Sequence, residues 1–386
     1  MGTKTNWQKN VLVYKIDSFL NWFYVPIGVW VLIWNHFFSF SQISLSMGIS
    51  LLVGVVCELP SGALADMIGR KKTVIFGRLI LFLGYVWLFF RHDFVGFLVW
   101  QIAYQIDGAF TSGANSALLY DSLKENGQAE KHYKKVEADT FMYNTIGMAV
   151  GGIVGGLLYE ITLMGPYNFM VLVAGLGLLA SCFYQEPAME KIGWSIGSYL
   201  GQNHKGFMHI FSNSRIRAVS LFSIAVSVVT YTGLWYLYEP RLAAGGFDPK
   251  LLAILVSGTY AIRAVGTRFS PTPLLMAISQ TMGTALSFIG GKFGAVGSVY
   301  LRKFVDGYRQ PSLVAWQNDQ IESIYRATSL SAISLLTNLI VGGVGPLLGM
   351  GIDRFGAEVT LGMWTIFGVL VVIQLGWRLE RIMKMN

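Results

Sequence analysis

Long apolar stretches recur along the whole chain, separated by short polar or glycine- and proline-containing breaks. Most are close to the roughly 20 residues that an α-helix needs to cross the hydrocarbon core of a bilayer. Buried strands would give runs of only about 4–8 residues, so the pattern predicts membrane-spanning helices. We predict twelve, at residues 11–35, 41–65, 72–90, 94–121, 135–159, 166–184, 216–239, 249–267, 271–290, 293–318, 327–350 and 358–378.

The composition agrees with this pattern. Hydrophobic residues make up 53% of the 386 residues and charged residues only 13%, whereas soluble domains carry about 25% charged residues. Cys57 and Cys182 are the only cysteines, and both fall in apolar stretches. We therefore expect no disulfide framework, no metal site and no cofactor. The N-terminus lacks the features of a cleaved signal peptide, so the first helix is expected to be a permanent anchor.

The formal net charge of +8 is best read as a topological signal. In a membrane protein the side on which Lys and Arg fall sets the orientation. Most of them fall on the connections that share a side with both termini, such as 70–72 and 131–135. We therefore predict an integral protein of the plasma (inner) membrane with both termini in the cytoplasm. No nucleic-acid partner is needed to explain the charge.

The chain divides into two similar parts. An amphipathic, cytoplasmic linker at residues 185–214 separates a six-helix half at 1–184 (the helices end at 184) from a second half at 215–386. An Asp-Gly pair occurs at residues 107–108 and again at 306–307, in the fourth predicted helix of each half. Parallel repeats of this kind are a known plan of transporters.

The sharpest motif is Gly-Ala-Leu-Ala-Asp-Met-Ile-Gly-Arg-Lys-Lys at residues 62–72, between the second and third predicted helices. It resembles the loop motif G-x-L-a-D-r-x-G-R-K-x of the major facilitator superfamily. Met67 stands where a basic residue is common in that motif. The resemblance, together with the twelve stretches and the repeat, implies an all-α, polytopic membrane fold of two pseudo-symmetric six-helix halves.

A cytoplasmic gate is the role that this resemblance implies for the motif. A glycine-bounded turn lets two helices reverse tightly, and Asp66 and Arg70 are expected to form a charge-assisted contact with Asp121 as a third member. A merely positive-inside loop is the alternative, but it leaves the aspartate and the two glycines unexplained. The predicted gating residues are Gly62, Asp66, Gly69, Arg70, Lys71, Asp121 and Glu58.

Asp107 is the first candidate for a proton carrier. Carboxylates at mid-membrane depth are costly, so they are functional candidates by default, although a structural pair with a tyrosine or a cation is the alternative. Asp306 is the equivalent candidate, unless Arg302 or Arg309 neutralises it; an unpaired arginine would instead attract an anionic substrate. The resemblance implies a cavity lined by the first, fourth, seventh and tenth helices. Its predicted lining residues are Tyr24, Gln101, Tyr104, Gln105, Tyr231, Trp235, Arg302 and Arg309.

Small residues recur at a spacing of four in the fifth and eleventh predicted helices, which favours close helix packing. They are Gly147, Gly151, Gly155, Gly345, Pro346 and Gly349. The fifth-helix run partly resembles a motif of exporters in the superfamily, with Gly152 in the place of its proline. The arginine of the exporters' fourth-helix motif is missing, since Tyr104 stands there.

These features predict a secondary active transporter rather than an enzyme. No GxxxxGK[ST] motif for ATP binding is present. We expect proton-coupled export of small organic or drug-like molecules by a monomer whose partners are its substrate, protons and the bilayer. A proton-coupled importer of a sugar or organic anion is one alternative. A non-transporting membrane sensor or receptor on the same fold is another.

Overall fold

The computed structural model is all-helical over the part of the chain that it describes, residues 5–187, 207–287, 291–322 and 326–385. This confirms the predicted fold class. The described helices form two compact units. Unit 1 comprises residues 1–33, 49–194 and 249–257, and unit 2 comprises 34–48, 195–248 and 258–386.

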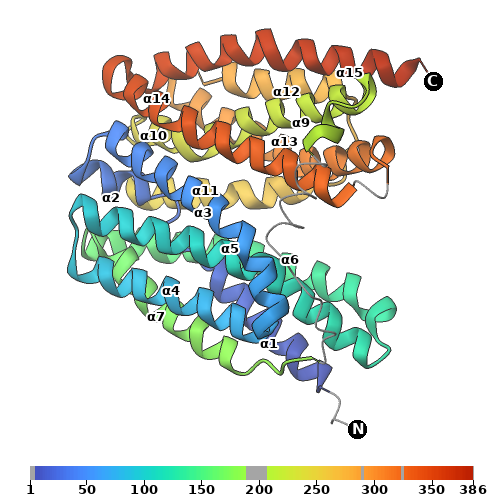
Figure 1. Ribbon diagram of the computed structural model, residues 1–386. Helices are drawn as coiled ribbons and strands as arrows, with labels where there is room; N and C mark the ends of the chain where they lie inside the picture. Colours follow the sequence, from blue (N-terminus) through green and yellow to red (C-terminus); the bar gives the residue numbers. More distant parts are fainter. Residues whose placement is uncertain (1–4, 188–206, 288–290, 323–325, 386) are drawn as a thin grey trace. The chain divides into compact units, whose positions relative to one another are not determined.

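Unit 1 is built from helices that follow the first six predicted stretches (Figure 1). Within it, α4 packs along α5 and α7, while α1 contacts α5, α6 and α7. Its core includes Val13, Val74, Leu118 and Leu119. The helices are α1 (Trp7–Trp22), α2 (Trp30–Phe37), α3 (Phe40–Ile68), α4 (Arg70–Phe90), α5 (Phe94–Glu125), α6 (Ala129–Ile161) and α7 (Gly165–Cys182). Unit 1 includes α2 only up to Ile33 and α3 only from Ile49, because residues 34–48 belong to unit 2.

Unit 2 follows the remaining stretches, and α9 packs against α13, α14 and α15 around a core that includes Val219, Phe222 and Val305. A π-helical segment, η1, interrupts the first long helix after Thr232. The elements are α9 (Ser214–Thr232), η1 (Gly233–Leu237), α10 (Tyr238–Ala243), α11 (Pro249–Gly266), α12 (Pro273–Ala285), α13 (Gly291–Gln320), α14 (Arg326–Gly368), η2 (Val369–Ile373) and α15 (Gln374–Lys384). Residues 249–257 of α11 belong to unit 1.

One predicted helix is divided in the structure. The stretch 11–35 was expected to form one helix, but α1 ends at Trp22 and α2 begins at Trp30. Pro26 lacks an amide hydrogen and Gly28 has a φ of 82°, so the intervening residues turn. The predicted break between residues 350 and 358 is present, because the element α14 consists of two helices joined at a kink, where Gly356 has a non-helical φ of 83°.

Six of the described helical stretches are long and apolar enough to cross a membrane. Large apolar side chains also point outward, as at Phe90 (77% exposed), Ile161 (75%) and Ile366 (61%). Exposed apolar surface on this scale suits contact with lipid rather than water. The chain is therefore an integral membrane protein. The total of twelve crossings and the cytoplasmic position of the termini stay predictions.

Candidate functional site

A cluster of charged side chains is buried inside unit 1, where α1, α4 and α5 meet. Arg78 of α4, Asp17 of α1 and Asp107 of α5 are 3%, 0% and 3% exposed. Nε and Nη2 of Arg78 donate to the two carboxylate oxygens of Asp17 at 2.8 and 3.0 Å. Its Nη1 donates to Oδ2 of Asp107 at 2.7 Å. Asp107 is thus paired with a cation that the sequence analysis did not identify.

Two amides complete this cluster. The Nη1 group of Arg78 also donates to Oδ1 of Asn21 at 2.7 Å, and Nδ2 of Asn115 donates to Oδ2 of Asp17 at 2.8 Å. Asp17 therefore accepts three hydrogen bonds, while Oδ1 of Asp107 has no partner among the residues described. The two carboxylates share one guanidinium, but Asp17 accepts more hydrogen bonds than Asp107 does. We call Asp17, Arg78 and Asp107 the charge triad.

The sequence contained a signal for the two missed members. Asp17 and Arg78 each interrupt an apolar stretch, as Asp107 does, and the argument about ionisable groups at membrane depth applies equally to them.

A small cavity adjoins the charge triad. Its volume is about 20 Å³, enough for about one water molecule. Asn21, Tyr24, Arg78 and Tyr104 are among the side chains that line it. Two of the predicted cavity residues, Tyr24 and Tyr104, therefore lie beside the triad, with their ring centroids 6.4 Å apart.

The other two predicted cavity residues of α5 have different surroundings. Gln101 is buried, at 9% exposure, and Gln105 is half-buried where Gly54 of α3 approaches it. Neither lines the cavity beside Arg78.

The motif at residues 62–72 is mostly helical rather than an extended loop. Helix α3 continues to Ile68, and α4 begins at Arg70. The reversal therefore occurs at Gly69 alone, whose φ of 104° favours glycine. This corrects the expectation of a turn bounded by both glycines, because Gly62 lies inside α3. The side chains at positions 62 and 66 are outside the described part, so the predicted contact of Asp66 stays a prediction.

Arg70 and Asp121 do meet. Nη1 of Arg70 lies 2.8 Å from Oδ2 of Asp121, and the two side chains are 19% and 23% exposed. Glu186 adds a feature that the sequence analysis missed: its carboxylate accepts the backbone N–H groups of Arg70 and Lys71 at 2.7 and 2.9 Å. A carboxylate at this position satisfies the first amides of α4 and complements the helix dipole.

Glu58 lies close to this ion pair without joining it. A hollow of about 350 Å³ is lined by Glu58, Ser61, Arg70 and Ser112, among others. No salt bridge to Glu58 is present among the described side chains. The hollow gives Glu58, which lies inside α3 rather than near its end, the access to water that an unpaired carboxylate in an apolar helix requires.

The Arg70–Asp121 pair gives a first testable prediction. A pair this exposed contributes only about 0–1 kcal/mol to stability. If it gates transport, Asp121→Asn should lower the transport rate in proteoliposomes severalfold without lowering the thermal unfolding temperature appreciably. Exchanging the charges (Arg70→Asp with Asp121→Arg) should restore part of the rate. Unchanged transport in Asp121→Asn would contradict the gating role.

In unit 2, Asp306 of α13 is bound by two arginines. Nη2 of Arg309 lies 2.9 Å from its Oδ1, and Nε of Arg263, on α11, lies 2.9 Å from its Oδ2. The sequence analysis named Arg309 as a partner but missed Arg263. It also named Arg302, which instead donates to Oγ1 of Thr284 at 2.7 Å and to the carbonyl of Val229 at 3.2 Å.

Tyr231 and Trp235 also come together in unit 2. Their rings stack with centroids 5.1 Å apart and an interplanar angle of 12°. The guanidinium of Arg309 lies 5.0 Å from the Tyr231 centroid. The predicted cavity residues thus fall into two groups, one in each unit.

The glycines of α6 lie against the chain near the end of α1. A Cβ built at Gly155 would lie within 1.8 Å of the carbonyl oxygen of Val25, so only glycine fits without movement. Gly147 and Gly151 likewise approach the backbone at Phe19 and Tyr24. Close packing accounts for these positions without any role in the direction of transport.

In α14, Gly345 lies beside the ring of Tyr236. Gly349 lies beside Phe40 and Ser44, and Pro346 lies near Gly48. The eleventh predicted helix therefore packs closely on the beginning of α3, within unit 2.

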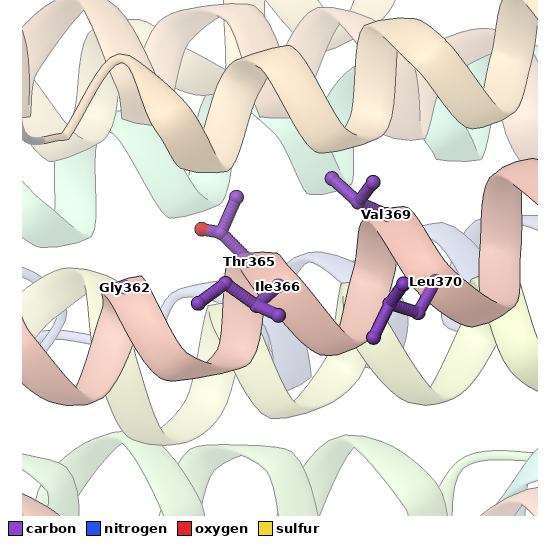
Figure 2. A pocket seen from close by; sticks show the side chains of 5 residues that line it. All are labelled: Gly362, Thr365, Ile366, Val369 and Leu370. Atoms are coloured by element: carbon purple, nitrogen blue, oxygen red, sulfur yellow. The ribbon is translucent and has the colours of Figure 1, made fainter.

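A further hollow, of about 410 Å³, lies on α14 and η2 in unit 2. Gly362, Thr365, Ile366, Val369 and Leu370 line it, and Figure 2 shows that they all come from this one continuous helix. Its lining is almost wholly apolar, and Ile366 and Leu370 are exposed. These properties are those of a lipid-facing groove, since no polar group is placed to orient a solute.

Among the residues described, no group of three or more His, Cys, Asp or Glu side chains is arranged to hold a metal ion.

Comparison with known proteins supports the fold strongly and the sequence family weakly. No family model matches the chain. Over 85 residues it is 38% identical to an uncharacterized transporter of Buchnera aphidicola subsp. Schizaphis graminum (strain Sg). That match covers 22% of this chain and 21% of the relative, so the chain spans about a fifth of the length of the curated relative it matches.

Solved structures resemble almost the whole chain. Two crystal structures of the nucleoside transporter NupG align with TM-scores of 0.82 and 0.77, at 13% and 14% identity, over 96% and 97% of this chain and 99% and 100% of theirs. A bacterial homolog of the human lysosomal transporter Spinster gives 0.73 at 17% identity, covering 99% of both chains. A D-xylose–proton symporter gives 0.72 at 14% identity, over 95% of this chain and 97% of its own. The chain therefore has the major-facilitator fold.

Proposed function

We propose that this chain is a secondary active transporter that moves a small organic molecule by alternating access and couples that movement to protons. The charge triad carries the proposal. Two buried carboxylates share one guanidinium, so the triad has a formal charge of −1 when all three groups are ionised. An unbalanced buried charge is costly, and taking up one proton removes it.

Asp107 is the group that we propose to take up the proton. It has one charge-assisted bond and a free Oδ1, whereas Asp17 accepts three hydrogen bonds that stabilise its ionised form. Protonation of Asp107 weakens its bond to Arg78 and leaves the Arg78–Asp17 pair intact. The ion pair between α4 and α5 then depends on protonation, while the ion pair between α4 and α1 does not.

Transport is favoured over a sensor or receptor role by the fold neighbours, which include a nucleoside transporter and a proton symporter. For direction, we propose export of small organic or drug-like molecules, because aromatic side chains such as Tyr24 and Tyr104 adjoin the triad. Proton-coupled import of an organic anion is the second candidate, since unit 2 has buried arginines that suit an anion. We further propose a monomer with both termini in the cytoplasm.

Proton flux in proteoliposomes tests this function. Purified protein is reconstituted with a pH-sensitive dye inside the vesicles, and a pH gradient is imposed in either direction. A panel of cationic dyes, sugars and organic anions is then added, with protein-free liposomes as the control. We expect at least one compound to move with a matching proton flux, and the gradient that drives its accumulation gives the direction. Compound movement that is indifferent to the pH gradient would contradict proton coupling.

A further inference from the structure

Unit 2 contains more buried positive than negative charge around Asp306. Arg302 and Arg309 are each only 2% exposed, and Arg263 and Lys303 are half-buried beside them. Asp306 balances Arg309 and Arg263 at 2.9 Å each. Glu239 of α10 is within electrostatic range of Lys303. Among the described residues, four basic side chains thus face two carboxylates, which leaves a formal excess of +2.

Hydrogen bonds and aromatic rings surround two of these cations, Arg302 and Lys303. Among the described residues, Arg302 has no salt-bridge partner; it donates to Thr284 and Val229, and its guanidinium lies 3.7 Å from the centroid of the Tyr238 ring. Lys303 likewise lies 4.3 Å from the Tyr260 centroid. Cation–π contacts offset part of the cost of desolvation, but they add no negative charge. Tyr238 itself is buried, at 2% exposure.

The cluster is not wholly enclosed. Arg302 and Arg309 are sealed in the helix bundle, whereas the side chain of Arg263 is 29% exposed and Lys303 and Tyr260 are half-buried. An anion reaching this edge would meet Lys303 and Arg263 first. It would also add negative charge to a cluster that has more cations than carboxylates.

An aromatic pair is linked to this cluster through Arg309. Tyr231 and Trp235 stack on each other, and Arg309 connects them to the cluster through its contacts with Tyr231 and Asp306. Trp235 belongs to the π-helical segment η1. Such π-turns are frequent at functional sites because they shift side chains out of the regular helical register.

We infer that unit 2 binds a small organic anion, with a carboxylate or phosphate held by Lys303 and Arg263 and an aromatic body placed against Tyr231 and Trp235. This rests on the proposed function only in taking the anion as the transported solute; the binding site itself does not require proton coupling. The geometry matches the chemistry of the two ends of such a molecule. Lys and Arg recognise the charged group, and aromatic rings provide the apolar contact.

Binding of matched aromatic probes tests the site. The full-length protein is placed in phosphatidylcholine nanodiscs, and dissociation constants are measured for benzoate, phenyl phosphate and the neutral benzamide. We expect at least one of the two anions to bind at least tenfold more tightly than benzamide. Lys303→Gln and Arg263→Gln should each remove most of that preference, and Lys303→Arg should keep it. Lys292→Gln, which changes an exposed lysine on the same helix, serves as the control and should have no effect.

The outcomes separate this site from the transport proposal. Equal binding of the anions and benzamide, or no change in a folded Lys303→Gln protein, would overturn the site even if neutral compounds show proton-coupled transport. Anion binding without proton-coupled movement would instead overturn the proposed function and leave the site standing. Competition by added phosphatidylglycerol that abolishes benzoate binding would assign the site to a lipid headgroup and reject a soluble solute. Thermal unfolding verifies that each variant is folded, and Lys303→Arg provides the comparison if Lys303→Gln is not.

Discussion

The variant Asp107→Asn is expected to reduce pH-gradient-driven transport to background while the protein stays folded. Asparagine has the shape of a protonated aspartate but cannot release a proton. The Arg78–Asp17 pair remains in the variant, held by two hydrogen bonds of 2.8 and 3.0 Å. The triad then carries no net charge, so the interior of unit 1 should lose little stability.

Two measurements verify this expectation. Proton flux in proteoliposomes should fall to the level of protein-free vesicles, whereas the thermal unfolding temperature in detergent should change little. Asp319→Asn, which changes an exposed carboxylate, is the matched control and should transport normally. Undiminished proton coupling in Asp107→Asn would exclude this carboxylate as the carrier. A large fall in unfolding temperature would show that Asp107 has mainly a structural role.

The second large effect is expected at Arg78. In Arg78→Gln the carboxylates of Asp17 and Asp107 stay buried without a cation, and the bonds of 2.7–3.0 Å to Arg78 are lost. Breaking a buried ion pair by removing one partner costs about 3–5 kcal/mol. Thermal unfolding in detergent should show a large loss of stability. Arg91→Gln, at an exposed pair with Asp93, should change stability by less than about 1 kcal/mol.

A neutral triad separates charge from packing at this position. Adding Asp17→Asn and Asp107→Asn to Arg78→Gln removes all three charges, because each side chain is replaced by an amide. Most of the lost stability should return. If the triple variant is as unstable as Arg78→Gln alone, the contribution of Arg78 comes from its shape and packing, and the electrostatic account of the triad is wrong.

Local properties of the chain explain why its helical course could be predicted. Apolar stretches of membrane length, separated by polar breaks, correspond to helices throughout the described residues. The break between α1 and α2 was also readable, since Pro26 and Gly28 stand in the middle of that stretch. The break between the last two predicted helices was readable as well. Asp353, Arg354 and Gly356 lie in the interval 351–357 that separates them, and the chain kinks at Gly356.

The sequence by itself determined an all-helical membrane protein and singled out Asp107 as a candidate, because both follow from the composition of single segments. Only the tertiary structure decided what Asp107 touches. Its cation lies 29 residues away on α4, and the second carboxylate lies 61 residues from that cation on α1. Asp306 is a second example. It pairs with Arg263 on α11, and not with Arg302, which lies one turn away on its own helix. Helical periodicity fixes which residues share a face. Which faces meet, and so which charges are balanced, depends on how the helices pack.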